Sequence, residues 1–266
     1  MKVPVLGIIA GDGSLPKQIV DVYSGVGGKC FVAAVARQGN FALNQQSFAI
    51  GQAGKILKYF TDNEVENIII IGGIKRPDLS NLSVDITGAM LLAKIAHKKI
   101  RGDDNILRII AEFLEGKGFR VISAKEILNL QNSEVMVKSY IQPLKKELDD
   151  ISLGKIVMEA LGEVDVGQSV VVHQGYVLGI EAAEGTDNLI TRCAALRKKT
   201  EGGVLVKMVK SGQDFRLDTP VVGPETIEKL AQHGYAGLAI EANIIIAEPE
   251  RFLQLLDQHK LFLYMI

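Results

Sequence analysis

The chain has 266 residues with 30 basic and 31 acidic side chains, so its formal net charge is −1. This balance offers no basic excess to a phosphate polymer and argues against a nucleic-acid partner. The length suits one large or two small domains, and an apolar content of 47% predicts well-packed cores. The apolar runs are strand-sized, and the first one ends too early for a secretory signal, so we expect a soluble, cytoplasmic protein.

The first half of the sequence alternates short apolar strands with helices. Continuous apolar strands separated by helices are typical of a parallel sheet that is covered on both faces. We therefore predict a Rossmann-like, parallel-sheet domain over residues 1–130. Its expected strands are residues 3–10, 30–36, 67–71 and 119–123, and its expected helices are residues 15–23, 54–60, 88–100 and 105–114.

The second half has a different rhythm. Residues 131–150 lack strand signals and contain a charged run, so we predict a linker there. Residues 151–266 are predicted to form a mixed α/β catalytic domain, with a hairpin around Gln174-Gly175 and a helix capped by Thr186. The whole chain is thus an α/β protein. The expected strands are residues 170–173, 176–180, 203–208, 235–240 and 262–266, and the expected helices are residues 187–198, 224–234 and 249–260.

The loop after the first expected strand is a candidate phosphate-binding segment. Its glycines allow a tight turn, and backbone N–H groups at the following helix start can hold an anion. It departs from the dinucleotide fingerprint because Pro16 replaces the third glycine, and the second strand lacks an acid for a ribose. A nucleotide or phosphate ligand of another kind is favoured over NAD(P), with a plain structural turn as the alternative. The candidate residues are Gly11, Asp12, Gly13, Ser14 and Leu15.

A second glycine loop follows the third expected strand, where open α/β sheets bind ligands. Two glycines let a ligand approach the backbone, and two basic side chains offer cationic contacts. The alternative is a solvated loop. The candidate residues are Gly72, Gly73, Ile74, Lys75 and Arg76.

Asp214, Arg216 and Asp218 alternate with apolar residues in the second half. In an extended strand these three side chains share one face, and Phe215 and Leu217 face inward. Two carboxylates so spaced suit Mg²⁺, and the arginine suits a phosphate. The alternative is an ion-paired, solvated strand face.

Other polar segments are weaker candidates. The segment 181–187, with the three acids Glu181, Glu184 and Asp187 beside Gly185 and Thr186, lies where a hairpin enters a helix. It suits either a metal or sugar contact or simple stabilisation of the helix start. Asp103 or Asp104 is most simply a helix N-cap, with a substrate or metal contact as the other interpretation. Gln168 lies at a strand end, and Lys207 offers a cation for phosphate oxygens.

Taken together, these segments resemble the LpxI-type UDP-2,3-diacylglucosamine pyrophosphatases of the lipid A pathway. The resemblance runs nearly from end to end. In the first half it rests on GIIAGDGSLP (7–16), GKILK (54–58), GGIKRP (72–77) and GDD (102–104); in the second half it rests on DVGQ (165–168), EAAEGTD (181–187), GGVLVK (202–207) and GQDFRLDTPVVGP (212–224).

The resemblance implies two domains and Mg²⁺-dependent hydrolysis of UDP-2,3-diacylglucosamine to UMP and lipid X. It also implies a single essential aspartate in the second half, which we carry over to Asp218, with Asp214 as the alternative. Asp218, Asp214 and Asp187 are the implied metal ligands, and the glycine loops, Asp103, Gln168, residues 184–186, Lys207 and Arg216 the implied substrate contacts. Two further possibilities are a homodimer and a peripheral contact with the inner membrane through the acylated substrate.

Two other function classes compete with this interpretation. One is a Rossmann-type NAD(P)-dependent oxidoreductase, which Pro16 and the missing acid of the second strand disfavour. The other is a non-catalytic nucleotide-sugar binding protein, which the pair Asp214 and Asp218 makes less economical.

Overall fold

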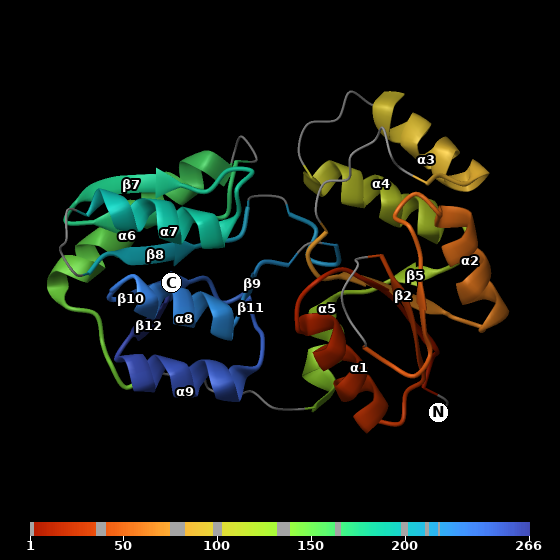
Figure 1. Ribbon diagram of the computed structural model, residues 1–266, viewed down its shortest axis with the longest axis horizontal. Helices are drawn as coiled ribbons and strands as arrows, with labels where there is room; N and C mark the ends of the chain where they lie inside the picture. The colour runs from red at the N-terminus through yellow and green to blue at the C-terminus, as the bar shows by residue number, and fades with distance from the viewer. Residues whose placement is uncertain are drawn as a thin grey trace. The chain divides into compact units, whose positions relative to one another are not determined.

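The structure is a computed structural model that describes residues 3–35, 41–74, 83–97, 103–131, 139–162, 166–197, 202–210, 213–217 and 219–266. The chain divides into two units, each with its own sheet (Figure 1). The first unit comprises Met1–Glu134 and the short segment Asp214–Asp218. The second unit comprises Val135–Gln213 and Thr219–Ile266.

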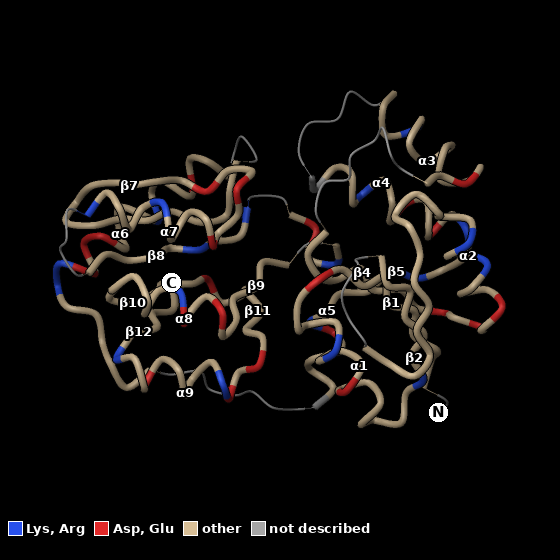
Figure 2. The backbone as a smooth tube through the Cα atoms, viewed as in Figure 1, with Lys and Arg blue, Asp and Glu red and all other residues tan. Residues whose placement is uncertain are grey.

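The first unit contains a parallel sheet of five strands in the order β3-β2-β1-β4-β5. Its central strands carry no charged residue (Figure 2), which fits strands that are covered on both faces. The strand order reverses between β1 and β4, because β1 pairs with β2 on one side and with β4 on the other. The strands are β1 (Leu6–Ala10), β2 (Cys30–Ala34), β3 (Gln45–Ser47), β4 (Asn67–Ile71) and β5 (Arg120–Val121).

Helices join these strands and bury apolar side chains against them. The core of the first unit includes Phe60, Ile68 and Phe119, together with Leu217 from the Asp214–Asp218 segment. Ser123 and Glu126 form a capping box at the start of α5. The helices are α1 (Leu15–Gly25), α2 (Ala53–Asp62), α3 (Ile86–His97), α4 (Asp103–Glu115), α5 (Ala124–Leu128) and the 3₁₀ turn η2 (Asn129–Gln131).

The second unit contains a mixed sheet in the order β12-β10-β8-β6-β7. The strands β8, β10 and β12 are parallel, whereas β6 pairs antiparallel with both β7 and β8. The predicted hairpin is present, and its turn residues Gln174 and Gly175 both have positive φ. The strands are β6 (Ser169–His173), β7 (Tyr176–Ile180), β8 (Val204–Lys207), β10 (Gly237–Ile240) and β12 (Phe262–Met265), with β9 (Val221–Val222) and β11 (Ile245–Ile246) forming a separate pair.

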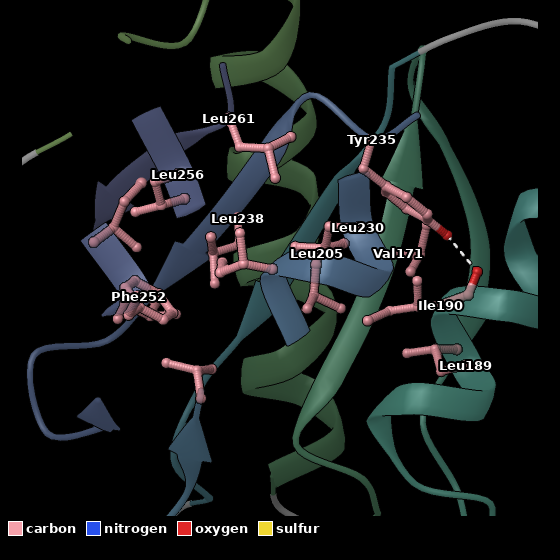
Figure 3. Packing of buried hydrophobic residues seen from close by; sticks show 14 of the residues in the cluster. Val171, Leu189, Ile190, Leu205, Leu230, Tyr235, Leu238, Phe252, Leu256 and Leu261 are labelled. Carbon is pink, nitrogen blue, oxygen red and sulfur yellow. Dashed lines mark hydrogen bonds between the residues drawn. The ribbon is translucent and has the colours of Figure 1, made fainter. Parts of the chain in front are cut away.

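Side chains on the second sheet alternate between two buried layers, as strand geometry requires. Leu205 and Leu238 face one layer with residues of α7, α8 and α9 (Figure 3). Val204 and Val206 face the other layer with residues of α6. The hydroxyl of Tyr235 donates to a backbone carbonyl of α7 at 2.8 Å. The helices are α6 (Lys145–Gly162), α7 (Thr186–Leu196), α8 (Pro224–Gln232) and α9 (Pro249–His259).

The two-part α/β architecture predicted from the sequence is confirmed, with local corrections. Helix α6 begins at Lys145, inside the segment predicted as a linker; its first turns bury the charged residues Glu147 and Asp150, which read as a solvated run in the sequence. Helix α7 begins at Thr186, and Gly185 rather than Thr186 is its N-cap. In the part of the chain that the structure describes, no helix combines the length and apolar character needed to cross a bilayer.

Candidate active site

The two glycine loops lie side by side at the carboxyl edge of the first sheet. Gly11 follows β1 and Gly72 follows β4, which are the strands that flank the reversal of strand order. The N–H of Asp12 donates to the carbonyl oxygen of Gly73 at 2.8 Å, and the N–H of Gly73 donates back to the carbonyl oxygen of Asp12 at 2.8 Å. Ligands of open α/β sheets bind at this kind of position. The structure thus joins two loops that the sequence indicated separately.

This pairing of the loops requires glycine. A Cβ atom at Gly11 would lie 2.5 Å from the carbonyl oxygen of Gly73, and a Cβ atom at Gly72 would lie 2.8 Å from the carbonyl oxygen of Asp12. Gly72 also has a φ of +95°, in the region that side chains rarely adopt. Any side chain at either position would push the two backbones apart.

We expect Gly72→Ala to lower the free energy of unfolding more than Gly118→Ala does. The two φ angles, +95° and +93°, are nearly equal, so alanine meets the same strain of about 1–2 kcal/mol at each position. A Cβ atom at Gly118 meets nothing within 4 Å, whereas at Gly72 the overlap with backbone adds about 1–3 kcal/mol. Urea unfolding of both variants measures the difference. Equal losses would contradict the tight pairing.

Helix α1 begins directly after the first loop, so its N-terminal end lies at the same edge of the sheet. Leu15 and Pro16 are buried and anchor the first turn, and Ser14 is the N-cap without a side-chain bond to the helix. A Cβ atom at Gly13 would meet no other atom within 4 Å. Backbone N–H groups at such a helix start suit an anion. Ile74 is 39% exposed, whereas Lys75 and Arg76 lie outside the described residues.

The segment that follows Gln213 forms a turn and not the extended strand predicted from its alternation. The N–H of Leu217 donates to the carbonyl oxygen of Asp214 at 2.9 Å, and the Asp214 carboxylate accepts the N–H of Arg216 at 3.0 Å. Such side-chain-to-backbone bonds are a common way in which aspartate closes a turn. Leu217 is buried but Phe215 is 41% exposed, so the prediction that both face inward is wrong for Phe215.

The Asp214 carboxylate is held by Arg216 in a bidentate ion pair. Arg216 Nε donates to Oδ1 at 3.0 Å and Nη2 donates to Oδ2 at 2.8 Å, while Nη1 reaches Glu115 Oε1 at 2.9 Å. The hydrogen bonds from Arg216 lower the pKa of the Asp214 carboxyl from its ordinary value. Asp214 is therefore engaged in fixing the turn. Asp218 lies outside the described residues.

We expect Asp214→Asn to lower the free energy of unfolding at pH 7 by about 1 kcal/mol or less, because the pair is partly exposed. A lowered pKa in the folded state means that the pair contributes stability above the unfolded value of about 3.9. That contribution disappears as the pH falls through the lowered value. Urea unfolding at several pH values should therefore show a gap between wild type and variant that closes toward acid.

The matched control for this prediction is Asp62→Asn. Asp62 pairs with Lys58 at 2.7 Å, but both side chains are exposed and no turn depends on them. We expect this control to change stability less than Asp214→Asn at every pH. If the difference in free energy of unfolding between wild type and Asp214→Asn stays the same in acid, the charge of the Asp214 carboxylate does not contribute to stability.

In the second unit, Lys207 ends β8 as a buried lysine, only 6% exposed. Its Nζ donates to Thr186 Oγ1 at 2.9 Å, and Thr186 Oγ1 donates to Glu181 Oε1 at 3.0 Å. Ser169 is the register partner of Lys207 in the β6–β8 ladder, and its hydroxyl lies 3.4 Å from that of Thr186. A buried charge is costly unless it is hydrogen-bonded. This network therefore fixes the ammonium group at the start of α7.

Two positive features meet at Thr186. It is the first residue of α7, and the N-terminal end of a helix carries about half a positive charge. The Lys207 ammonium is bonded to the hydroxyl of the same residue. Cations normally stabilise the opposite end of a helix, so Lys207 adds positive charge here, and the Glu181 carboxylate that accepts from Thr186 offsets part of it. Such an arrangement suits a phosphate.

The remaining candidates around this network have other roles. Arg192 Nη2 donates to Glu184 Oε1 at 2.6 Å and lowers the pKa of that carboxyl. Lys229 Nζ donates to Asp187 Oδ2 at 2.8 Å. Both acids are thus paired with cations of α7 and α8. The carbonyl oxygen of Gln168 accepts the N–H of Met208 at 3.0 Å, beside the end of β8.

The described residues by themselves do not assemble a metal site. No group of three His, Cys, Asp or Glu side chains in that part of the chain could hold an ion. Asp187 and Asp214, two of the three candidate ligands, are held by cations. Mg²⁺ is commonly bound by one or two carboxylates together with water and substrate phosphates. Asp218, the third candidate ligand, lies outside the described residues.

Sequence reasoning missed two residues of these clusters, Ser169 and Glu115, whereas Glu181 belongs to the acidic segment 181–187 that the sequence indicated. Glu181 and Ser169 complete the Lys207 network, and Glu115 holds Arg216. Glu181 is the first of the three acids of that segment and lies five residues before Thr186. The partner of Arg216 had none, since Glu115 lies 101 residues away in the sequence. Asp103 begins α4, and its side chain lies outside the described residues.

Comparisons with known proteins cover nearly the whole chain. A family model described as the LpxI N-terminal domain matches residues 5–130, and one described as the LpxI C-terminal domain matches residues 134–264. A curated relative is "UDP-2,3-diacylglucosamine pyrophosphatase LpxI" of Caulobacter vibrioides. It is 32% identical over 270 residues, which cover 97% of this chain and 95% of the relative.

Proposed function

The chain belongs to the LpxI family, and from this premise we propose that it hydrolyses the diphosphate of UDP-2,3-diacylglucosamine. The products would be UMP and 2,3-diacylglucosamine 1-phosphate (lipid X), in a cytoplasmic step of lipid A biosynthesis. The observation that carries the proposal is the curated relative, whose name states a pyrophosphatase of this substrate and which matches 97% of the chain.

In this reaction the oxygen of a water molecule forms a bond to one phosphorus while the bridging P–O bond breaks. The bridging oxygen leaves with the other phosphate, and the protons of water pass to the solvent or the products. The diphosphate is doubly negative and repels a nucleophile. Cationic groups and N–H donors that contact its oxygens therefore lower the barrier.

The Lys207 network supports a role in contacting the diphosphate. The Lys207 ammonium is held at a helix N-terminus by Thr186, whose hydroxyl is in turn held by Glu181. This preorganised positive charge would need little rearrangement when a phosphate binds. We assign Lys207 and Thr186 to phosphate oxygens and Glu181 to the positioning of Thr186.

The paired glycine loops support a role in holding the nucleotide. Gly11 and Gly72 keep two backbone segments close together at the carboxyl edge of the first sheet. A ligand can therefore approach the main chain there without meeting a side chain. We assign Gly13 and Ser14 to phosphate or ribose contacts through their backbone N–H groups, and Lys75 and Arg76 to cationic contacts.

We assign Asp218 to the orientation and deprotonation of the attacking water, since Asp214 is engaged by Arg216. Mg²⁺ is part of the proposal, held by Asp218 and by substrate phosphates; it would offset the diphosphate charge and polarise a phosphoryl oxygen.

Purified protein given UDP-2,3-diacylglucosamine and Mg²⁺ is expected to release UMP and lipid X in equal amounts. Excess EDTA should stop the reaction, and added Mg²⁺ should restore it. Chromatography of the nucleotide and the lipid measures both products, and ¹⁸O-labelled water identifies the phosphorus attacked. Release of UDP would contradict cleavage of the diphosphate. Full turnover in EDTA would contradict the requirement for Mg²⁺. Binding of a uridine nucleotide without hydrolysis would favour a non-catalytic binding protein.

A further inference from the structure

Helix α3 packs on the first unit with little of its own surface covered. Gly88 is the one buried residue of this helix. A Cβ atom there would lie 1.9 Å from the carbonyl oxygen of Gly51, so the helix is fixed by a close backbone approach. The side chains of Leu91, Leu92 and Ile95 are half-buried. The remaining face of the helix is turned to solvent.

That outer face is apolar. Ile86 is 84% exposed and Met90 is 68% exposed, and the exposed Ala93 follows them on the helix. At intervals of four and three residues these side chains form one stripe along the helix. A single exposed apolar residue is ordinary, but a contiguous apolar stripe marks a contact surface.

The C-terminal end of α3 is basic. Lys94 and His97 are exposed in its last turn, and the helix sequence ITGAMLLAKIAH contains no acid (Figure 2). Asp85, directly before the helix, accepts the N–H groups of Lys55 and Gly88. Cations beside an apolar stripe complement anionic lipid headgroups over a hydrocarbon layer.

We propose that α3 docks the protein on an anionic phospholipid surface. The helix has 12 residues and is too short to cross a bilayer, so it would lie flat on it. Ile86, Met90 and Ala93 would enter the layer below the headgroups, and Lys94 would lie beside lipid phosphates. The inference does not rest on the proposed reaction, because lipid vesicles without substrate test it. A substrate with two acyl chains would give such a surface a use.

The chain contains no tryptophan, so Met90→Trp places a unique fluorescent reporter on the stripe. With vesicles of phosphatidylcholine and phosphatidylglycerol, we expect its emission to shift to shorter wavelength and its quenching by acrylamide to fall. Vesicles of phosphatidylcholine alone should bind more weakly. The control is Leu43→Trp, at a fully exposed position of the same unit, whose emission should stay unchanged.

Two variants test the two parts of the surface. Ile86→Asp and Lys94→Glu, each combined with Met90→Trp, should weaken binding to the anionic vesicles about tenfold. Neither should alter the melting temperature, because both side chains are exposed. No spectral shift with anionic vesicles would overturn the proposal, as would an equal shift of the Leu43→Trp reporter. A shift without vesicles that grows with protein concentration would assign the stripe to a second copy of this chain and overturn it too.

Discussion

Asp218→Asn is expected to lower the turnover number at least about a hundredfold, a loss of about 2.7 kcal/mol of transition-state stabilisation. The resemblance to LpxI enzymes places the essential acid at Asp214 or Asp218, and the structure engages Asp214 with Arg216 through both carboxylate oxygens. Asparagine keeps the shape of the side chain but cannot accept a proton from water at neutral pH. Initial rates at saturating substrate measure the effect.

The same measurement on Asp214→Asn decides between the two acids. We expect this variant to keep a turnover number within about tenfold of wild type and to show its effect in unfolding experiments instead. The reverse pattern would make Asp214 the essential acid. If Asp218→Asn keeps more than about a tenth of the wild-type rate, the loss is below about 1.4 kcal/mol, and Asp218 is not the essential group.

Lys207→Met is expected to lower kcat/KM about a hundredfold, the usual scale for losing one preorganised charge-stabilising group. Methionine fills a similar volume without the ammonium group, and Thr186 keeps its bond to Glu181. Lys207 is only 6% exposed, and its removal leaves the Thr186 hydroxyl without its donor and the partly buried Glu181 carboxylate without a cation in the network. The free energy of unfolding should therefore fall, by about 1–3 kcal/mol.

Lys155→Met is the matched control for Lys207. It removes the same charge from the same unit, at a half-exposed position on α6 that pairs with Glu159 at 3.9 Å. Its kcat/KM should remain at the wild-type value. An unchanged kcat/KM in Lys207→Met, measured under conditions where the variant is fully folded, would remove this lysine from the proposed phosphate contacts and leave it a structural role.

The sequence predicted those strands, turns and helix starts that are determined by the residues within the element itself. Strand β4 has the bounds expected from the sequence, because a continuous apolar run between polar residues suits a strand of a parallel sheet. The β6–β7 hairpin was predictable because Gln174-Gly175 tolerates the positive φ angles of its turn. Helix α8 begins at Pro224 as expected, since proline favours the first turn of a helix.

The parts that the sequence could not predict depend on distant partners. The turn at Asp214 is held by an arginine that also reaches Glu115, so the alternation of neighbouring residues was a misleading guide. The two glycine loops were each recognisable, but the bond between Asp12 and Gly73 follows from the pairing of β1 with β4. The Lys207 network likewise arises because strand register sets Ser169 opposite Lys207.

The placement of Leu217 has a consequence for biosynthesis. This residue completes the core of the first unit, yet it follows residues 135–213 of the second unit along the chain. A ribosome delivers the N-terminal part first, and a domain normally folds as it emerges. Here one buried side chain of the first unit's core is translated only after residues 135–213. Translation therefore cannot finish one unit before it begins the other.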